Sequence, residues 1–268
     1  MPCAPTRCKP GRRNGGERVS LAGQWIIPDW PAPRHVRAAV STRQGPGVSA
    51  APFDRLNLGA RSGDSPEAVV TNRAAVQSSL GLERAPHWLQ QVHGVDVADI
   101  DRLEEDGEPR ADAAVTCRSG EPLAILTADC LPVLFCTQDG GAVAAAHAGW
   151  RGLVAGVLEA ALASLPAPPS QVLAWLGPCI GAPSYEVGEE VHDAFLAGDA
   201  GAEVCFTPTR PGHWLCDLAE LARRRLFAAG VAGAYGGGFD TRTDERFYSY
   251  RRDGARSGRF ASLIWLEG

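Results

Sequence analysis

The sequence predicts one layered α+β domain, and three observations carry this prediction. Strand-like and helix-like runs mix without the strict strand, helix, strand rhythm of a parallel α/β fold. Hairpin patterns dominate the middle of the chain. The 268 residues show no linker-like break after the first 20 or so, which favours a single core. We therefore expect residues 25–268 to form one domain and residues 1–24, rich in Pro, Gly and Arg, to be a disordered extension.

The first third of the chain predicts a strand and a helix. Residues 34–49, RHVRAAVSTRQGPGVS, read as a strand that ends in a Gly-Pro-Gly turn. Residues 64–82, DSPEAVVTNRAAVQSSLGL, read as a helix. Ser65 is the expected cap, Pro66 suits the first helical position, and Gly81 is expected to close the helix.

The middle of the chain predicts strands joined by tight corners. Residues 87–100, HWLQQVHGVDVADI, alternate apolar and polar positions, as a strand or a bent pair of strands does. Residues 122–130, PLAILTADC, and 131–138, LPVLFCTQ, are predicted strands on either side of an Asp-Cys corner. The Asp-Gly-Gly sequence at 139–141 predicts a hairpin turn, and 142–148, AVAAAHA, is the returning strand.

The last part mixes helices and strands. One helical face over residues 150–165 predicts a single helix. Residues 171–181 read as a strand that enters a Gly-Pro loop, and residues 187–198 and 217–230 read as helices. Residues 246–266 are predicted to form a closing hairpin.

Composition narrows the function. A net charge of -5 and a pI near 5.7 argue against nucleic-acid or anionic-membrane partners. Eight scattered cysteines without a C-x-x-C pair indicate a reducing compartment. With no signal peptide and no run of about 18 apolar residues, we expect a cytoplasmic monomer or small homo-oligomer that acts on a small molecule. Lys9 is the only lysine, which excludes a Schiff-base lysine in the domain and a lysine-containing phosphate loop.

Three side chains suited to metal binding stand at the ends of predicted strands, next to small residues. They are His93 in QVHG, Cys130 in TADC and His147 in HAGWRG. Two imidazoles and one thiolate suit Zn²⁺, and three protein ligands leave a fourth position open, as in catalytic zinc sites. Taken singly, each residue also fits an ordinary structural role as a turn histidine, a buried thiol or a strand-end histidine. If the three side chains meet at one point in the folded protein, they indicate a metal-dependent enzyme.

The same residues fit two other classes of protein. In a Cys-His hydrolase, Cys130 is the nucleophile, His147 or His93 is the base, and Asp129 orients the imidazole or binds substrate. A non-enzymatic protein that buffers metal or binds nucleoside is the other alternative. Only geometry and metal content separate these readings.

Two arginines are candidate anion ligands. Arg151 lies in the first turn of the helix predicted after His147, and Arg43 lies in STRQG. A multicopper cluster needs roughly eight or more histidines, and the sequence has six. The H-x-E and P-C-x-x-C signature of nucleobase deaminases does not occur.

Nine stretches together resemble one known family. They are STRQGPGVS, LNLG, NRAAV, WLQQVHG, TADCLPVLF, AAHAGWRGL, WLGPCIG, YEVG and RFYSYRRDGARSGRFASLIWL. In this order, from about residue 36 to 266, they resemble the YfiH-type laccase-domain family, whose members are described as multicopper polyphenol oxidases and as purine nucleoside phosphorylases. One departure is visible, because members often carry a cysteine where this chain has Asp240 before Thr241.

The resemblance implies a four-layer α/β/β/α sandwich with mixed sheets and a metal held by His93, Cys130 and His147. It implies phosphorolysis of adenosine, inosine and methylthioadenosine, and deamination of adenosine. From the residues themselves we expect zinc as the metal, Arg43 or Arg151 to position phosphate, and Asp129 to move protons or bind substrate. Copper-dependent oxidation of phenols (laccase activity) and hydrolysis of cell-wall muropeptide precursors are the alternatives that the family carries.

Overall fold

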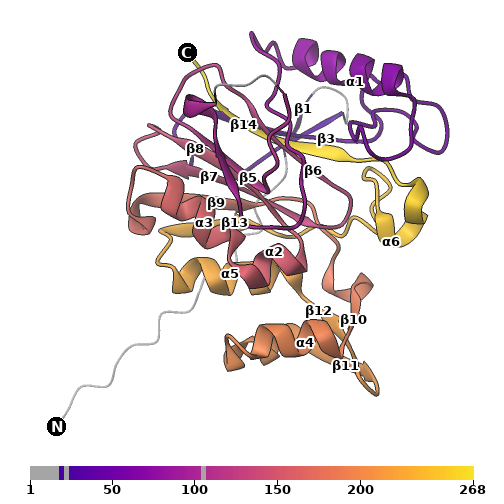
Figure 1. Cartoon of the computed structure of the whole chain (residues 1–268), viewed down its shortest axis with the longest axis vertical. Coiled ribbons are helices and arrows are strands. Elements are labelled where there is room, and N and C mark those ends of the chain that lie inside the picture. Colours follow the sequence, from indigo (N-terminus) through magenta and orange to yellow (C-terminus); the bar gives the residue numbers. More distant parts are fainter. Residues whose placement is uncertain (1–17, 21–23, 104–106) are drawn as a thin grey trace.

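The computed structural model describes residues 18–20, 24–103 and 107–268. The predicted disordered extension over residues 1–24 falls mostly outside these residues. Within it, Arg18–Ser20 form strand β1, which pairs antiparallel with β2 (Trp25–Ile27). The fold is a mixed α+β arrangement with several sheets, as the sequence predicts (Figure 1). Among the described residues, no helix combines the length and the hydropathy that a membrane crossing requires.

Two large sheets and one small sheet make up the β structure. The five-stranded sheet has the order β1-β2-β3-β14-β6, with β3 (Val36–Ser41), β14 (Phe260–Leu266) and β6 (Leu123–Thr127). The six-stranded sheet has the order β13-β9-β7-β8-β5-β4, with β13 (Gly233–Gly236), β9 (Val172–Leu176), β7 (Leu131–Thr137), β8 (Val143–Ala148), β5 (Ala113–Thr116) and β4 (Val97–Asp99). The small sheet joins β10 (Glu186–Gly188), β12 (His213–Cys216) and β11 (Phe206–Arg210).

The helices are short, apart from the first. The α-helices are α1 (Pro66–Ser79), α2 (Trp150–Ala155), α3 (Val157–Ser164), α4 (Glu189–Leu196), α5 (Leu218–Ala228) and α6 (Tyr250–Asp253). Short 3₁₀ helices occur at η1 (Ile100–Arg102), η2 (Pro169–Gln171), η3 (Ala182–Ser184), η4 (Ala200–Cys205) and η5 (Gly254–Arg256). The α1 prediction is confirmed, because Ser65 Oγ accepts a hydrogen bond from the Ala68 N–H.

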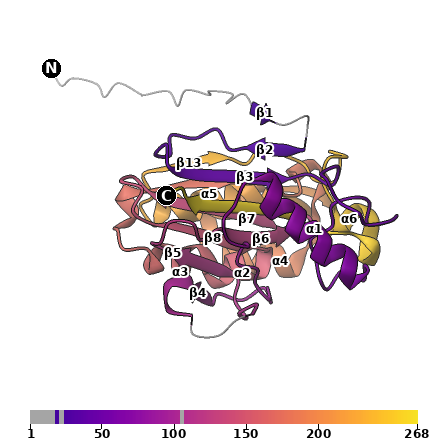
Figure 2. The ribbon, with the colours of Figure 1, turned by 90° about the horizontal axis from the view of Figure 1, so that it is seen from above.

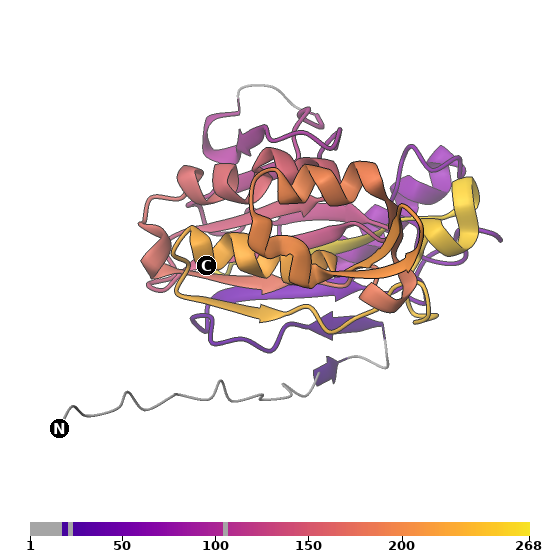
Figure 3. The ribbon, with the colours of Figure 1, turned by 90° about the horizontal axis from the view of Figure 1, so that it is seen from below.

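Three apolar cores hold the layers together. One lies between the two large sheets, where Phe260 and Ile264 of β14 face residues of β7, β8 and β9. The alternate residues Ala261 and Leu263 point to the opposite face and pack with Val76 of α1. The outer face of the six-stranded sheet packs against α2, α3, α4 and α5. Figures 2 and 3 show the sheets stacked and the helices covering this face.

Two sequence predictions are wrong in detail. Residues 150–165 form two helices instead of one, because Gly156 adopts a φ of 103° and ends α2 in a left-handed turn. Residues 246–266 do not form a hairpin. Helix α6 precedes the single strand β14, whose neighbours are β3 and β6. Local sequence carries no signal for such distant partners.

The Asp-Cys corner connects the two large sheets. Strand β6 pairs with β14 in one sheet, whereas β7 pairs with β8 and β9 in the other. Residues 128–130 therefore cross between sheets, which is why the chain turns there instead of continuing as one strand. In the register of β7 and β8, Pro132 lies opposite His147, so Cys130 lies close to the end of β8. The fold thus brings two of the predicted metal ligands to one edge.

Candidate metal centre and pocket

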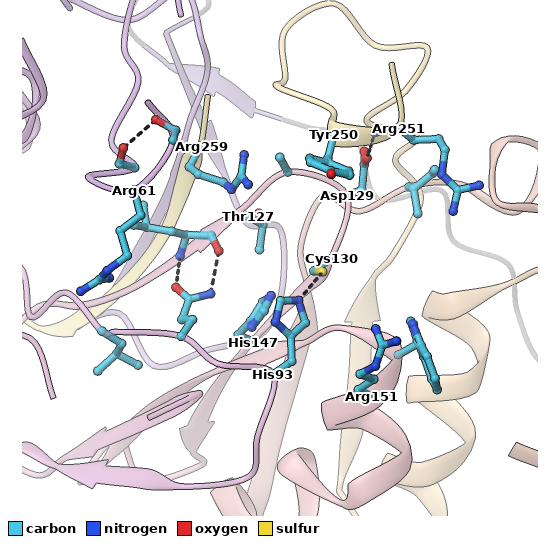
Figure 4. Close-up of a pocket in the computed structure, with 18 of the residues that line it drawn as sticks. Arg61, His93, Thr127, Asp129, Cys130, His147, Arg151, Tyr250, Arg251 and Arg259 are labelled. Atoms are coloured by element: carbon cyan, nitrogen blue, oxygen red, sulfur yellow. Dashed lines mark hydrogen bonds between the residues drawn. The ribbon is translucent and has the colours of Figure 1, made fainter. Parts of the chain in front are cut away.

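His93, Cys130 and His147 form one group. The metal-ligating atoms of the three residues all lie within 4.8 Å of one another. Cys130 Sγ is 3.7 Å from His93 Nε2, and the two imidazole rings meet edge to face with centroids 4.7 Å apart (Figure 4). Three loop or strand ends that are far apart in the sequence therefore supply one candidate metal centre.

Asp112, which the sequence analysis missed, organises the loop that carries His93. Its carboxylate accepts hydrogen bonds from the backbone N–H groups of Val92 (3.0 Å), His93 (2.9 Å) and Gly94 (2.7 Å). His93 has a φ of 62°, a left-handed conformation that is uncommon for a residue with a side chain. Three charge-assisted bonds to one carboxylate hold the loop in that conformation.

Asp112 also orients His147. Asp112 Oδ1 lies 2.8 Å from His147 Nδ1, and both side chains are buried. An ionised carboxylate can only accept a hydrogen bond, so His147 Nδ1 donates to Asp112. The other ring nitrogen, Nε2, is therefore the atom that His147 offers to a metal shared with His93 and Cys130. The only sequence signal for Asp112 is an acid directly before the apolar strand at 113–116, which by itself indicates no function.

The pKa values of Cys130, His147 and Asp112 are coupled. Burial raises the pKa of the Cys130 thiol, but His147 and His93 outweigh this and bring it to about 6. Burial lowers the pKa of His147, but the Cys130 thiolate and Asp112 raise it to about 9. Burial also raises the pKa of Asp112, yet the hydrogen bonds from His147 and from backbone N–H groups bring it below the ordinary value. A thiolate and two imidazoles are a donor set that both zinc and copper accept.

The three residues of the centre line a pocket of about 490 Å³. Trp150, Tyr185 and Tyr250 contribute aromatic walls. Arginines also line it, namely Arg61, Arg73, Arg151, Arg251 and Arg259. An aromatic pocket with a few convergent polar groups is the usual form of a small-molecule site.

Arg151 and Arg43, the two arginines predicted to bind substrate, lie in different pockets. Arg151 lines the pocket, with its guanidinium 4.3 Å from the centre of the Trp150 ring. Arg43 lines a second pocket of about 310 Å³, where its guanidinium lies 3.7 Å from Asp54. The structure therefore places Arg43 in a separate pocket and does not bring it to the metal centre.

Asp129 lines the pocket, but its carboxylate is already engaged. It accepts 2.6 Å hydrogen bonds from the Thr241 hydroxyl and from the Arg251 N–H. Its φ of 89° places it in a sharp turn. The side chain thus ties the corner before Cys130 to the C-terminal segment. Asp240, where family members often carry cysteine, similarly accepts hydrogen bonds from the Ser184 hydroxyl and the Gly181 N–H.

Gly149 is expected to be essential for ligand geometry. A Cβ at this position meets His93 Cδ2 at 2.7 Å and Cys130 Sγ at 3.1 Å. Gly149→Ala should therefore displace both ligands and lower metal affinity by about 10- to 100-fold, as loss of supporting contacts does at metal sites. Gly238→Ala is the matched control, because nothing lies within 4 Å of its Cβ. Isothermal titration with Zn²⁺ measures the change, and equal affinities of the two variants would contradict the crowding argument.

Comparisons with known proteins find relatives that match most of this chain. A purine nucleoside phosphorylase of Pseudomonas aeruginosa is 54% identical over 91% of this chain and 98% of its own length. The purine nucleoside phosphorylase YfiH of Escherichia coli is 50% identical over 90% and 98%. Among solved structures, a Neisseria meningitidis protein assigned to the DUF152 family is 47% identical with a TM-score of 0.87, covering 91% of this chain and all of that one. YlmD of Geobacillus stearothermophilus is 31% identical with a TM-score of 0.86, covering 93% and 98%.

The sequence profile of one family, described as multi-copper polyphenol oxidoreductase laccase, matches residues 37–267. This match includes all three candidate ligands and every residue that lines the pocket of the metal centre. The identity of 50 to 54% to two purine nucleoside phosphorylases extends over 90 to 91% of the chain. The chain therefore belongs to the multi-copper polyphenol oxidoreductase laccase family, as the sequence motifs predict.

Proposed function

We propose that this protein is a metal-dependent purine nucleoside phosphorylase that cleaves inosine, adenosine and methylthioadenosine. The observation that carries the proposal is the group of His93, Cys130 and His147 in the wall of a pocket of about 490 Å³ with aromatic lining. Phosphorylases of 50 to 54% identity support the choice of substrate. A volume of this size is within the range of small-molecule sites.

In phosphorolysis, an oxygen of inorganic phosphate forms a bond to the anomeric carbon of the ribose. The bond from that carbon to the base nitrogen breaks, and its electron pair leaves with the base, which takes up a proton. The chain contributes by holding the reactants together and by complementing their charge. Trp150 and Tyr185 offer flat apolar surfaces for a purine, and the Arg151 guanidinium offers positive charge at the pocket wall.

We propose zinc as the native metal, held by His93, Cys130 and His147, with copper as the alternative. When bound, the ion supplies a Lewis acid at this end of the pocket. Asp112 keeps the proton on His147 Nδ1, so Nε2 is the atom that would hold the ion after it releases its own proton. Metal analysis of the purified protein, followed by reloading with Zn²⁺ or Cu²⁺, tests this assignment. A cytoplasmic location and a monomeric or small homo-oligomeric state remain predictions.

Deamination of adenosine is the second activity proposed for this pocket. Water replaces the exocyclic amino group and ammonia leaves, so adenosine becomes inosine. The test of both activities is product analysis. We expect hypoxanthine and ribose 1-phosphate from inosine only when phosphate is present, and ammonia from adenosine without phosphate. Metal-loaded protein that produces no hypoxanthine contradicts the phosphorylase proposal.

A Cys-His hydrolase, such as one that edits muropeptides, is the second candidate, and one observation favours it. Cys130 has a thiol pKa of about 6 and lies beside His93, while His147 is paired with Asp112, as in nucleophilic cysteine sites. Such an enzyme keeps its activity after metal removal. The proposed metal enzyme loses activity in a chelator and regains it with Zn²⁺.

Alkylation of metal-free protein tests the charge state of this thiol. The thiolate is the reactive form, so the rate of iodoacetamide labelling of Cys130 should rise with pH, with a midpoint near pH 6. Cys117 is an internal control, because partial burial and the neighbouring Asp101 raise its thiol pKa. Mass spectrometry at pH 5, 6 and 7 separates the two sites. Zn²⁺ should protect Cys130, and labelling that stays slow up to pH 8 would contradict the thiolate.

Polyphenol oxidation has less support from the residues. The whole sequence holds six histidines, and one group of three ligands meets at a point in the described part of the chain. Clusters of several copper ions need more imidazoles than this. Assay of copper-loaded protein with a phenol substrate tests the remaining alternative of a single-copper oxidase.

A further inference from the structure

Arg259 and Thr127 lie side by side on one wall of the pocket. Thr127 is the last residue of β6, and it pairs across the sheet with Phe260, the first residue of β14. Arg259 immediately precedes that strand. Both residues line the pocket (Figure 4), on the side of Cys130 away from Arg151. The pairing of β6 with β14 therefore fixes the positions of Thr127 and Arg259 in the pocket wall.

The Arg259 guanidinium forms no direct ion pair with a carboxylate among the described residues, and the Cys130 thiolate and Asp129 carboxylate act on it only at longer range. Its NH1 donates to the backbone oxygens of Ser257 and Gly258, both at 2.8 Å. By contrast, Arg61 and Arg73 share Glu108, at 3.2 and 2.6 Å. Arg259 is half-buried, and burial lowers its pKa. A charge held partly out of water without a direct ion pair is costly, and a bound anion removes that cost.

Thr127 adds an unused hydrogen-bonding group beside this charge. Its side chain is 2% exposed, and its hydroxyl has no hydrogen-bond partner in the described part of the chain. Buried hydroxyls in folded proteins are nearly always paired, so an unpaired one on a pocket wall is the kind of group that a bound ligand satisfies. A hydroxyl can donate to a phosphate oxygen while the guanidinium binds the others.

We propose that Arg259 and Thr127 form the subsite for the inorganic phosphate that attacks the nucleoside, an inference that rests on the proposed phosphorylase function. Nucleosides are neutral, so phosphate is the reactant that benefits from a guanidinium without a direct ion pair. Arg151 is the competing candidate. It is exposed and stacks on Trp150, so water screens its charge more strongly than that of Arg259.

The experiment compares Thr127→Val, Arg259→Lys and Arg259→Met with the wild type, all loaded with zinc to the same content. Isothermal titration with inorganic phosphate gives the Kd, and steady-state kinetics give separate KM values for phosphate and inosine. We expect Thr127→Val to weaken phosphate binding about tenfold and Arg259→Met about 100-fold. Arg259→Lys should lie between, because lysine keeps the charge but not the paired donors. The KM for inosine should change less than threefold.

Thr127→Val also separates binding from folding. Valine is nearly isosteric and removes a buried hydroxyl that has no partner, so its melting temperature should equal or exceed that of the wild type. Arg37→Met is the control for loss of an arginine, because Arg37 is exposed on β3 and pairs with Glu267 at 3.9 Å. It should leave phosphate binding unchanged.

The outcomes distinguish this inference from the proposed function. Phosphorolysis of inosine with an unchanged phosphate Kd in Thr127→Val and Arg259→Met overturns the subsite and leaves the function intact. A large loss in Arg151→Met alone overturns it in the same way and places phosphate at α2. Phosphate binding that depends on Arg259 and Thr127, in a protein that does not cleave nucleosides, supports an anion subsite here and overturns the phosphorylase. Wild-type protein that binds no phosphate overturns the inference.

Discussion

Cys130→Ala is expected to abolish stoichiometric metal binding and to reduce inosine phosphorolysis to background. Cys130 supplies the one thiolate of the group, and its removal leaves two imidazoles of which His93 is exposed. The fold should survive, because Cys130 lies at a half-buried corner and not in an apolar core. Metal content by mass spectrometry, phosphorolysis rate and melting temperature measure the three effects.

The control for Cys130→Ala is Cys117→Ala, which removes an exposed thiol. This control should keep full metal content and full activity. A Cys130→Ala protein that still binds one metal ion per chain with unchanged affinity shows that the thiolate is not a ligand. Loss of activity with metal retained points instead to the nucleophilic role of the Cys-His hydrolase.

Asp112→Asn should have the second largest effect, because one buried carboxylate supports two of the three ligands. An amide oxygen replaces only part of the acceptor capacity, and the amide NH₂ faces backbone N–H groups that are also donors. We expect metal affinity to fall about 10- to 100-fold and the free energy of unfolding to fall by about 2 to 4 kcal/mol. Zinc titration and urea unfolding of the metal-free protein measure the two quantities separately.

Asp193→Asn is the matched control for Asp112→Asn. Asp193 also lies beside a histidine, with Oδ1 at 3.0 Å from His192 Nδ1, but its side chain is 68% exposed. Exposed pairs contribute little, so its unfolding free energy should change by less than about 0.5 kcal/mol. If Asp112→Asn binds zinc as tightly as this control, orientation of His147 by Asp112 is not needed for the site.

The local sequence was sufficient to predict helix caps and tight turns, because these depend on residues close together in the chain. The Ser65 cap and Pro66 start α1 as predicted, and the Asp-Gly-Gly turn joins β7 to β8. The motifs also identified the family and the three candidate ligands, because small residues next to His93, Cys130 and His147 mark corners where side chains face open space. These signals act over a few residues and need no knowledge of the rest of the fold.

Only the tertiary structure shows which of the candidate substrate-binding residues lie in the pocket of the metal centre. Arg43 and Arg151 are equally plausible anion ligands in the sequence, yet only Arg151 lines the pocket of the metal centre. Asp129 looked free, but Thr241 and Arg251, more than 100 residues away, occupy its carboxylate.

Asp112 and Arg259 carried no sequence signal, because their roles come from partners that pairing between distant strands brings to them. Asp112 directly precedes β5, which pairs with β8, the strand that carries His147. Arg259 directly precedes β14, which pairs with β6, the strand that ends at Thr127. The sequence by itself determined the ligand types and the local turns. The pairing of strands far apart in the chain decided which side chains share a site. Backbone N–H and C=O groups pair strands in the same way for all residues except proline, so the residues of one strand do not indicate which distant strand lies beside it.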